Sequence, residues 1–349
     1  MPNDTQMTIA FTSCMSTDVF AKSQPVWSRI AEEKPDLLIL LGDSIYIDVS
    51  ATPGGFSHPP APDTASSVND FAQHVLNLYQ RQLAIPEFAA LIGQTPTLAI
   101  WDDHDFLWND ADSRYRENPQ YLGHMVVSSN LFQCWQQALN GQALPANTSD
   151  SRVWKRWSDV ASNIQYDPAM PGYRVHNFLD GQVWVHLTDG RSWRRKDKKQ
   201  LLGSDQRQRI ENEITKNAPA GALHILASGS TFNKSEFLQE SWQSYPEDCQ
   251  WLLDLASQHN MLVLSGDLHK VMVPQPVPCV DKQLHEAVAS GAAVNFAPWH
   301  VGEHDTVGQY TEKFGLLKID AALDGQVGLQ LFDHGQNLPA LQRTWPRCF

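Results

Sequence analysis

Ionisable side chains gather directly after one apolar run of the sequence, residues 97–101. The next four residues are Asp102, Asp103, His104 and Asp105. Three carboxylates this close together repel one another unless positive charge compensates them. A metal ion at the end of a buried strand would supply that charge, whereas the commoner explanation is a solvated loop in which an Asp caps the next helix. The stretch alone leaves both interpretations open.

Three other apolar runs end in residues that can bind metals. Cys14 follows a first strand, Asp43 and Tyr46 follow a second, and Asp267 and His269 follow a late strand. Because the carboxyl ends of strands in an α/β sheet lie along one edge, we expect these side chains to converge. The bland interpretation of an isolated cysteine, a small buried hydrophobe, still applies to Cys14.

Together, a thiolate, a phenolate, carboxylates and an imidazole are enough ligands for more than one metal, with one carboxylate bridging the ions. Two metals about 3.5–4 Å apart can hold the attacking and leaving oxygens of a phosphoryl transfer and lower the pKa of bound water. The residues therefore favour metal-assisted phosphate chemistry.

The elements that position these residues follow an α/β order. Residues 35–41, 222–228 and 261–265 are short apolar runs, typical of strands covered on both faces. Helical spacing begins near Asn69 or Asp70 and returns over residues 126–139, 204–217 and 248–259. Asp180-Gly181 separates two further strands and predicts a hairpin. Residues 285–291, 316–319 and 327–332 predict a second sheet packed on the first, and hence one two-sheet sandwich with outer helices.

Composition limits the class of protein. The chain has 349 residues, 42% hydrophobic and 19% charged, which is ordinary for a globular protein. A net charge of −13 argues against a general nucleic-acid or membrane-surface binder. No apolar run reaches the roughly 18 residues of a membrane span, and no export signal is visible. Five scattered cysteines do not suggest a disulfide framework, so we expect the cytoplasm, with the periplasm as the alternative.

Six ordered segments resemble one family. FTSC, GDSIY, WDDHD, TDGRSWR, SGDLH and ASG, between Phe11 and Gly291, resemble the PhoD-like alkaline phosphatase family of the calcineurin-like metallophosphoesterase superfamily. The resemblance implies an α/β fold, a four-layer α/β/β/α sandwich of two mixed sheets, with residues 1–349 as one domain. It also implies hydrolysis of small-molecule phosphate monoesters or diesters by metal-activated hydroxide. The implied cofactors are Fe3+ plus Ca2+ or another divalent ion such as Zn2+, Mn2+ or Mg2+.

The resemblance also assigns residue roles. The metal ligands it implies are Cys14, the bridging Asp43, the phenolate of Tyr46, Asp103, Asp267 and His269. His104 corresponds to the superfamily's substrate-facing histidine, which can donate to the leaving group, with Asp105 as its orienting acid. Asp102 has no assigned role beyond support of the ligands or a local cap.

Two substrate-binding residues are expected besides His104. Arg191 could bind a phosphate bidentately, although a structural pair with Asp189 is the alternative. No histidine stands at the end of residues 222–228, where many superfamily members place a ligand, so Ser228, Ser230 or Asn233 is expected to border the site. The alternative function is a catalytically silent metal-containing module that binds phosphorylated or nucleotide ligands. A metal-free serine hydrolase has no Gly-x-Ser-x-Gly segment to support it.

Overall fold

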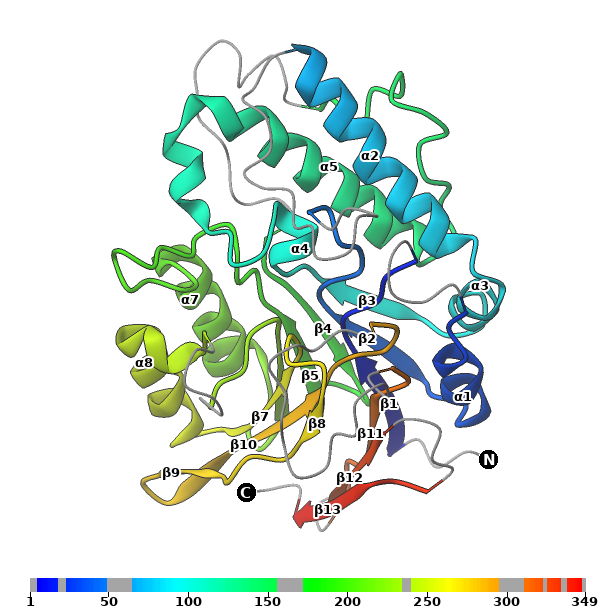
Figure 1. Cartoon of the computed structure of the whole chain (residues 1–349). Coiled ribbons are helices and arrows are strands. Elements are labelled where there is room, and N and C mark those ends of the chain that lie inside the picture. Colours follow the sequence, from blue (N-terminus) through cyan, green and yellow to red (C-terminus); the bar gives the residue numbers. More distant parts are fainter. Residues whose placement is uncertain are drawn as a thin grey trace.

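Two β-sheets and the helices outside them make up the part of the chain that the computed structural model describes (Figure 1). These are residues 5–17, 23–48, 65–155, 172–233, 240–294, 311–322, 325–333 and 338–346. In this part, the first sheet has the strand order β13-β12-β11-β1-β2-β3. The second has the order β4-β5-β6-β7-β10-β8, and β9 pairs with β10.

The strands of the first sheet are β1 (Gln6–Thr12), β2 (Leu37–Leu41), β3 (Thr97–Ile100), β11 (Phe314–Asp320), β12 (Gln326–Phe332) and β13 (Leu341–Pro346). Those of the second are β4 (Arg174–Phe178), β5 (Val183–Leu187), β6 (Leu223–Ser228), β7 (Asn260–Ser265), β8 (Val271–Met272), β9 (Val277–Cys279) and β10 (Lys282–Ala289). In the first sheet β1, β2 and β3 are parallel, while β11 runs antiparallel to β1. In the second, β5, β6, β7 and β10 are parallel. Both sheets are therefore mixed.

The helices are α1 (Val26–Glu32), α2 (Ala65–Leu83), α3 (Pro86–Ile92), α4 (Asp103–Phe106), α5 (Leu122–Ala138), α7 (Ser204–Asn212) and α8 (Pro246–Ala256). Single turns of other helix types are η1 (Ser113–Glu117), η2 (Pro119–Tyr121), η3 (Glu213–Asn217) and η4 (Trp242–Ser244). None of the described helices is long and apolar enough to span a membrane.

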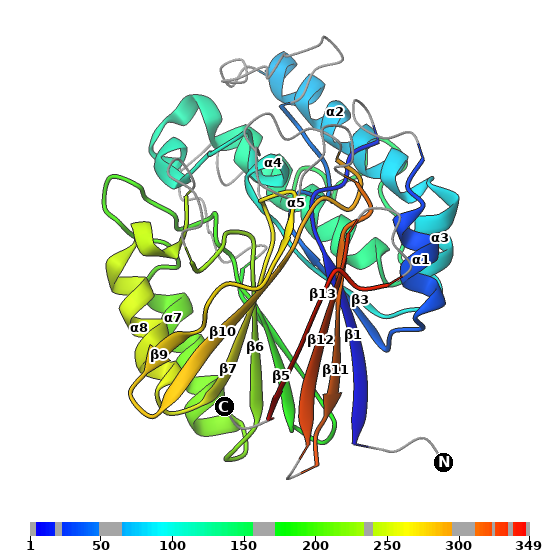
Figure 2. The same ribbon diagram turned by 60° about the horizontal axis from the view of Figure 1, so that its bottom comes forward.

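Four layers result from this arrangement. Figure 2 shows α1 and α3 outside the first sheet and α7 and α8 outside the second. Between the sheets, side chains such as Phe11, Ile39 and Leu262 form one buried core. The other faces of the strands pack on the helices, so that all five residues of β2 are buried, as its unbroken apolar run predicts. The predicted four-layer sandwich of two mixed sheets is confirmed.

The predicted elements correspond closely to the observed ones, with one change of sheet. The hairpin at Asp180-Gly181 joins the antiparallel pair β4 and β5. Strands β11 and β12 were expected in a second sheet, but they extend the first sheet beside β1, which would otherwise present an unpaired edge. Of the three late segments, β10 alone joins the second sheet.

Candidate metal centre

The predicted metal ligands lie where strands of both sheets end. Cys14 follows β1, Asp43 follows β2, and Asp103 begins α4 just after β3. Asp267 follows β7, which belongs to the second sheet. Ligands separated by up to about 250 residues in the chain thus meet, because the carboxyl ends of parallel strands point toward one end of the sandwich.

Gly266 lies at a close contact between the two sheets at this end. A Cβ on Gly266 would lie 2.7 Å from the carbonyl oxygen of Leu41 and 2.7 Å from Oγ of Ser13. Leu41 is the last residue of β2, and Ser13 directly follows β1. A residue without a side chain is therefore required directly before Asp267.

Asp43 lies at the middle of the predicted ligands. The thiol of Cys14 donates to Oδ2 of Asp43 at 3.3 Å, and the hydroxyl of Tyr46 donates to the same oxygen at 3.4 Å. The Tyr46 hydroxyl also lies 3.0 Å from Nε2 of His269. Sγ of Cys14 lies 3.8 Å from the carbonyl oxygen of Asp267. The structure therefore brings these five residues into direct contact.

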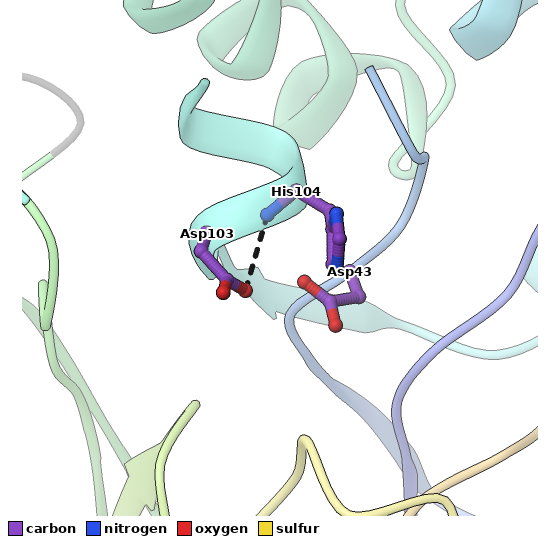
Figure 3. Close-up of side chains that lie close together, drawn as sticks. All are labelled: Asp43, Asp103 and His104. Carbon is purple, nitrogen blue, oxygen red and sulfur yellow. Dashed lines mark hydrogen bonds between the residues drawn. The ribbon is translucent and has the colours of Figure 1, made fainter. Parts of the chain in front are cut away.

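Asp103 and His104 approach Asp43 from the other side. Asp43, Asp103 and His104 can each offer one ligand atom, and these atoms lie within 4.8 Å of one another (Figure 3). The Asp103 carboxylate is fixed by two backbone amides, those of His104 at 3.2 Å and Asp110 at 2.7 Å. The other five predicted ligands thus gather around the carboxylate of Asp43.

Burial makes this cluster costly without a cation. It raises the pKa of Cys14 to about 11 and, together with Cys14, raises the pKa of Asp43 well above its usual value. Burial, followed by the charges of nearby aspartates, raises the pKa of Asp267 in the same way. Oδ1 of Asp43 and Oδ2 of Asp102 have no hydrogen-bond partner among the described residues. A bound cation would reverse these shifts and occupy the two oxygens, so the residues present fit a metal site.

The backbone at the ligands is strained. Cys14, Asp43, Asp267 and His269 have φ angles of 61°, 52°, 72° and 52°, in the left-handed region that residues with a Cβ seldom adopt. Each such residue costs about 1–3 kcal/mol. Strain of this kind clusters at functional sites, where the surrounding sheets hold side chains in an orientation that a relaxed strand end would not give.

His104 has a carboxylate partner that the sequence analysis missed. Its Nδ1 lies 2.6 Å from Oδ1 of Asp48, and Oδ2 of Asp48 accepts from the backbone amide of Asn109 at 3.0 Å. The His104 ring also packs on the Tyr46 ring with centroids 4.2 Å apart. Burial lowers the pKa of His104, but Asp48, Asp103 and Asp43 outweigh it and raise that pKa well above 6.5. These carboxylates thus favour the charged imidazolium form of His104.

Asp105, the predicted orienting acid of His104, has a different set of partners. Its carboxylate accepts from the backbone amides of Ser44 at 3.0 Å, Ile45 at 3.2 Å and Asp102 at 3.2 Å. It therefore ties the turn after β2 to the start of α4. Asp48 therefore occupies the position beside the imidazole, whereas the Asp105 carboxylate is held by these three amides.

Arg191, expected to bind substrate, has its guanidinium bound within the protein. Only 2% of the residue is exposed. Nε donates to Oδ1 of Asp102 at 2.5 Å, Nη1 donates to the carbonyl oxygen of Ala111 at 3.2 Å, and Nη2 lies 3.5 Å from Oδ1 of Asp103. The alternative partner, Asp189, accepts from the backbone amide of Arg191. Arg191 is thus a buried counter-charge for two aspartates.

Asn233 also differs from the expectation of a substrate-binding residue. Its side-chain amide donates to Oε2 of Glu286 at 3.0 Å, and its backbone amide donates to the same oxygen at 2.9 Å. Glu286 lies on β10, so these bonds anchor the segment after β6 to the neighbouring strands. These hydrogen bonds give Asn233 a structural role.

A second buried arginine, Arg194, was not selected from the sequence. It donates to Oε2 of Glu240 at 2.9 Å and to Oγ of Ser230 at 2.7 Å. The same Glu240 oxygen lies 3.3 Å from Nζ of Lys196 and 4.0 Å from Nη1 of Arg191. Glu240 therefore lies among three basic side chains, a contact that no local spacing in the sequence could reveal.

Comparison with known proteins gives a family model that matches residues 9–297, described as PhoD-like phosphatase. The match covers more than half of the chain and includes every residue of the cluster around Asp43. No significant match was found among curated proteins.

Solved structures share the fold. A structure of PhoD is 18% identical to this chain, with a TM-score of 0.64 over 98% of this chain and 68% of that one. The purple acid phosphatase PPD1 from yellow lupin (Lupinus luteus) seeds is 13% identical, with a TM-score of 0.56 over 98% of this chain and 54% of that one. At these identities the likeness supports the architecture alone.

Proposed function

Since the chain belongs to the PhoD-like phosphatase family and is therefore a phosphoric ester hydrolase, we propose that it hydrolyses small-molecule phosphate monoesters or diesters at a multinuclear centre around Asp43. The observation that carries the proposal is the convergence of side chains from the ends of β1, β2, β3 and β7 on one carboxylate with an unpartnered oxygen. We further propose that residues 1–349 form a single domain, because the core between the two sheets is continuous.

The family implies dependence on divalent metal, and we propose particular metals for particular residues. Cys14, Asp43, Tyr46, Asp267 and His269 would hold Fe3+, since a phenolate is a hard donor that suits a trivalent ion. Asp43 and Asp103 would hold Ca2+ or another divalent ion, which takes oxygen ligands. When bound, the metals neutralise phosphate charge and lower the pKa of water.

The chain's own residues supply the proton transfer. Because Nδ1 of His104 is held by Asp48, Nε2 is the nitrogen available to the substrate. Water loses a proton to solvent and attacks phosphorus, the P–O bond to the leaving group breaks, and the proton on Nε2 passes to the leaving oxygen. Solvent then returns a proton to Nε2. Asp48 orients the ring and stabilises its charge throughout.

The test of this function is a substrate panel measured together with metal content. Metal-restored protein should hydrolyse p-nitrophenyl phosphate, bis-p-nitrophenyl phosphate or both. Asp43→Asn should lose at least about 100-fold in kcat/KM, because replacing a group that merely supports a metal ligand already costs 10–100-fold. Asp254→Asn, on the exposed face of α8, is the control and should retain full activity. No hydrolysis of either ester, or full activity in Asp43→Asn, would refute the proposal.

The alternative of a silent binding module is tested by His104→Ala. A binding protein does not need a leaving-group donor. The binding function would be favoured if His104→Ala bound inorganic phosphate as tightly as wild type and wild type hydrolysed neither ester.

The iron assignment has a separate spectroscopic test. A ferric phenolate gives a visible charge-transfer band, which should disappear in Tyr46→Phe. A colourless, iron-free protein with normal activity would rule out iron.

A further inference from the structure

Asp102 occupies a space that two glycines leave open. A Cβ on Gly42, at the end of β2, would lie 2.6 Å from Cβ of Asp102. A Cβ on Gly229, just after β6, would lie 2.5 Å from Cγ and from Oδ1 of Asp102. The ends of both sheets therefore make room for this one carboxylate, which is more than a solvated helix cap requires.

The two oxygens of Asp102 have different surroundings. Oδ1 accepts from Nε of Arg191 at 2.5 Å, and the residue forms a capping box with Asp105 at the start of α4. Oδ2 has no hydrogen-bond partner among the described residues, although Asp102 is only 1% exposed. A buried carboxylate oxygen without a partner destabilises the fold, and a bound cation would remove this cost.

Two other carboxylates lie within ligand distance of Asp102. Asp43, Asp102 and Asp267 can each offer one oxygen, and the three atoms lie within 4.8 Å of one another. Oxygens bound to one Ca2+ at about 2.3–2.6 Å can be up to roughly 5 Å apart, so this spacing fits a common ion. Asp43 also has an unpartnered buried oxygen, Oδ1.

We propose that Asp102 is a metal ligand, and that with Asp43 and Asp267, which the proposed iron site would share, it forms an all-carboxylate subsite for a hard divalent cation such as Ca2+, Mg2+ or Mn2+. The preference follows from the donor set, because this group of three offers only carboxylate oxygen. The inference rests on the metal-dependent function proposed above and adds a ligand that neither the family resemblance nor the paired site of Asp43 and Asp103 includes.

Arg191 acquires a role from this assignment. Carboxylates that bind metals are themselves hydrogen-bonded by neighbouring groups, which fix their orientation. Nε of Arg191 binds Oδ1 of Asp102 and thereby leaves Oδ2 as the oxygen available to the cation. The buried guanidinium is thus a positioning group for the subsite, held in turn by the carbonyl oxygen of Ala111.

The test is the divalent-cation content and affinity of Asp102→Asn in the full chain. Asn caps a helix as well as Asp and can still accept from Arg191, so the fold should be retained while the anionic oxygen is lost. We expect Mn2+ titrations followed by calorimetry and electron paramagnetic resonance to show one class of site missing or at least 10-fold weaker. The absorption band assigned to Tyr46 should persist, because Tyr46 does not belong to this group of carboxylates.

Asp112→Asn is the matched control. Asp112 is equally buried and pairs with Nε of Arg114 at 2.8 Å, but it lies outside the group of three carboxylates. Asp102→Ser, which keeps a capping side chain, replaces Asp102→Asn if the latter does not fold.

Wild-type cation content and affinity in a folded Asp102→Asn or Asp102→Ser protein would overturn the inference. An equal loss in Asp112→Asn would also overturn it, because the effect would then be general. Neither result contradicts the proposed hydrolysis, because hydrolysis is measured on the wild-type protein. Conversely, an inactive wild type that still loses one Mn2+ site through Asp102→Asn would leave the ligand assignment standing and remove the function.

Discussion

His104 illustrates how a single side chain depends on a partner outside its own segment. Its ring packs on the Tyr46 ring, and its Nδ1 contacts the carboxylate of Asp48, which is 56 residues earlier in the chain. The carboxylate that follows His104 at the next position, Asp105, is used to secure the backbone of Ser44 and Ile45. The acid that controls the histidine is therefore Asp48.

Asp48→Asn should lower kcat by about 10–100-fold. A general acid contributes about 100–10,000-fold to the rate, and this substitution weakens the orientation and charge of His104 without removing it. The loss should be larger for an alkyl phosphate than for p-nitrophenyl phosphate, whose leaving group needs little protonation. Metal content should not change, since Asp48 lies outside both groups of possible ligands.

Steady-state kinetics on the two esters checks this prediction. An equal loss on both substrates would contradict the positioning role and indicate a general structural effect of Asp48→Asn.

At the same scale, the sequence identified the residues at strand ends but not their partners. Cys14, Asp43, Asp103 and Asp267 each follow an apolar run, so a local pattern was sufficient to select them. The contact of Arg191 with Asp102 spans 89 residues, and nothing in the local spacing encodes it. Roles that depend on such contacts could be assigned only from the structure.

Among the elements, β1 and β11 meet through a glycine. Gly315 of β11 is paired with Phe11 of β1, and a Cβ on Gly315 would overlap the Phe11 ring. Phe11 is fully buried in the core between the sheets, where close packing restricts its movement.

Gly315→Ala should therefore destabilise the protein by about 1–3 kcal/mol, the usual cost of overpacking a core. Gly328→Ala on β12 is the control, because its Cβ would meet Lys318 at an ordinary 3.7–3.9 Å. Urea unfolding measures both. Equal stability of the two variants would show that Phe11 adapts to the added methyl group.

A buried histidine pair joins β5 and β6. Nε2 of His186 lies 3.0 Å from Nδ1 of His224, and Nδ1 of His186 lies 2.7 Å from the Tyr173 hydroxyl. Burial lowers the pKa of His186 well below 6.5 and lowers the pKa of His224 to about 3. Both rings are therefore neutral in the fold, whereas the unfolded chain takes up protons below about pH 6.5.

Stability from this pair is fully present above about pH 6.5 and is lost as the pH falls toward 3, because the unfolded state then binds more protons. Between pH 7 and pH 5 one such histidine should account for about 2 kcal/mol. His224→Gln should reduce this dependence, as measured by urea unfolding at pH 7, 6 and 5. A variant that loses as much stability as wild type over this range would exclude His224 as its source.

The sequence predicted most elements but not how distant ones pair. Strands β2, β6 and β7 are continuous apolar runs and were recognisable at once. Strand β13 lacks that signal, since its residues are mostly exposed. The sheet of β11 and β12 was predicted wrongly because its partner, β1, lies at the other end of the sequence.

For the whole molecule, the proposed metal centre joins the two sheets, since Asp43 and Asp103 come from one and Asp267 from the other. Removal of metal leaves buried carboxylates that repel one another across this junction. A chelator should therefore lower the melting temperature by roughly 5–10 °C, and Mn2+ or Ca2+ should restore it.

Differential scanning calorimetry with and without chelator provides the measurement. Asp43→Asn is the control and should respond little, because the shared carboxylate is missing. The same melting temperature for wild type in both conditions would show that metal does not stabilise the junction.

The pairing of β1 with β11 also has a consequence for synthesis. Thr8 lies opposite Lys318 in the register of β1 and β11. Strand β1 therefore leaves the ribosome about 300 residues before its partner, an interval of roughly 15–60 s at about 5–20 residues per second. During that interval one edge of β1 can pair with β2. Its other edge is unpaired and can contact other nascent chains made from the same mRNA. Production of this protein should therefore benefit from chaperones that shield an early strand until translation is complete.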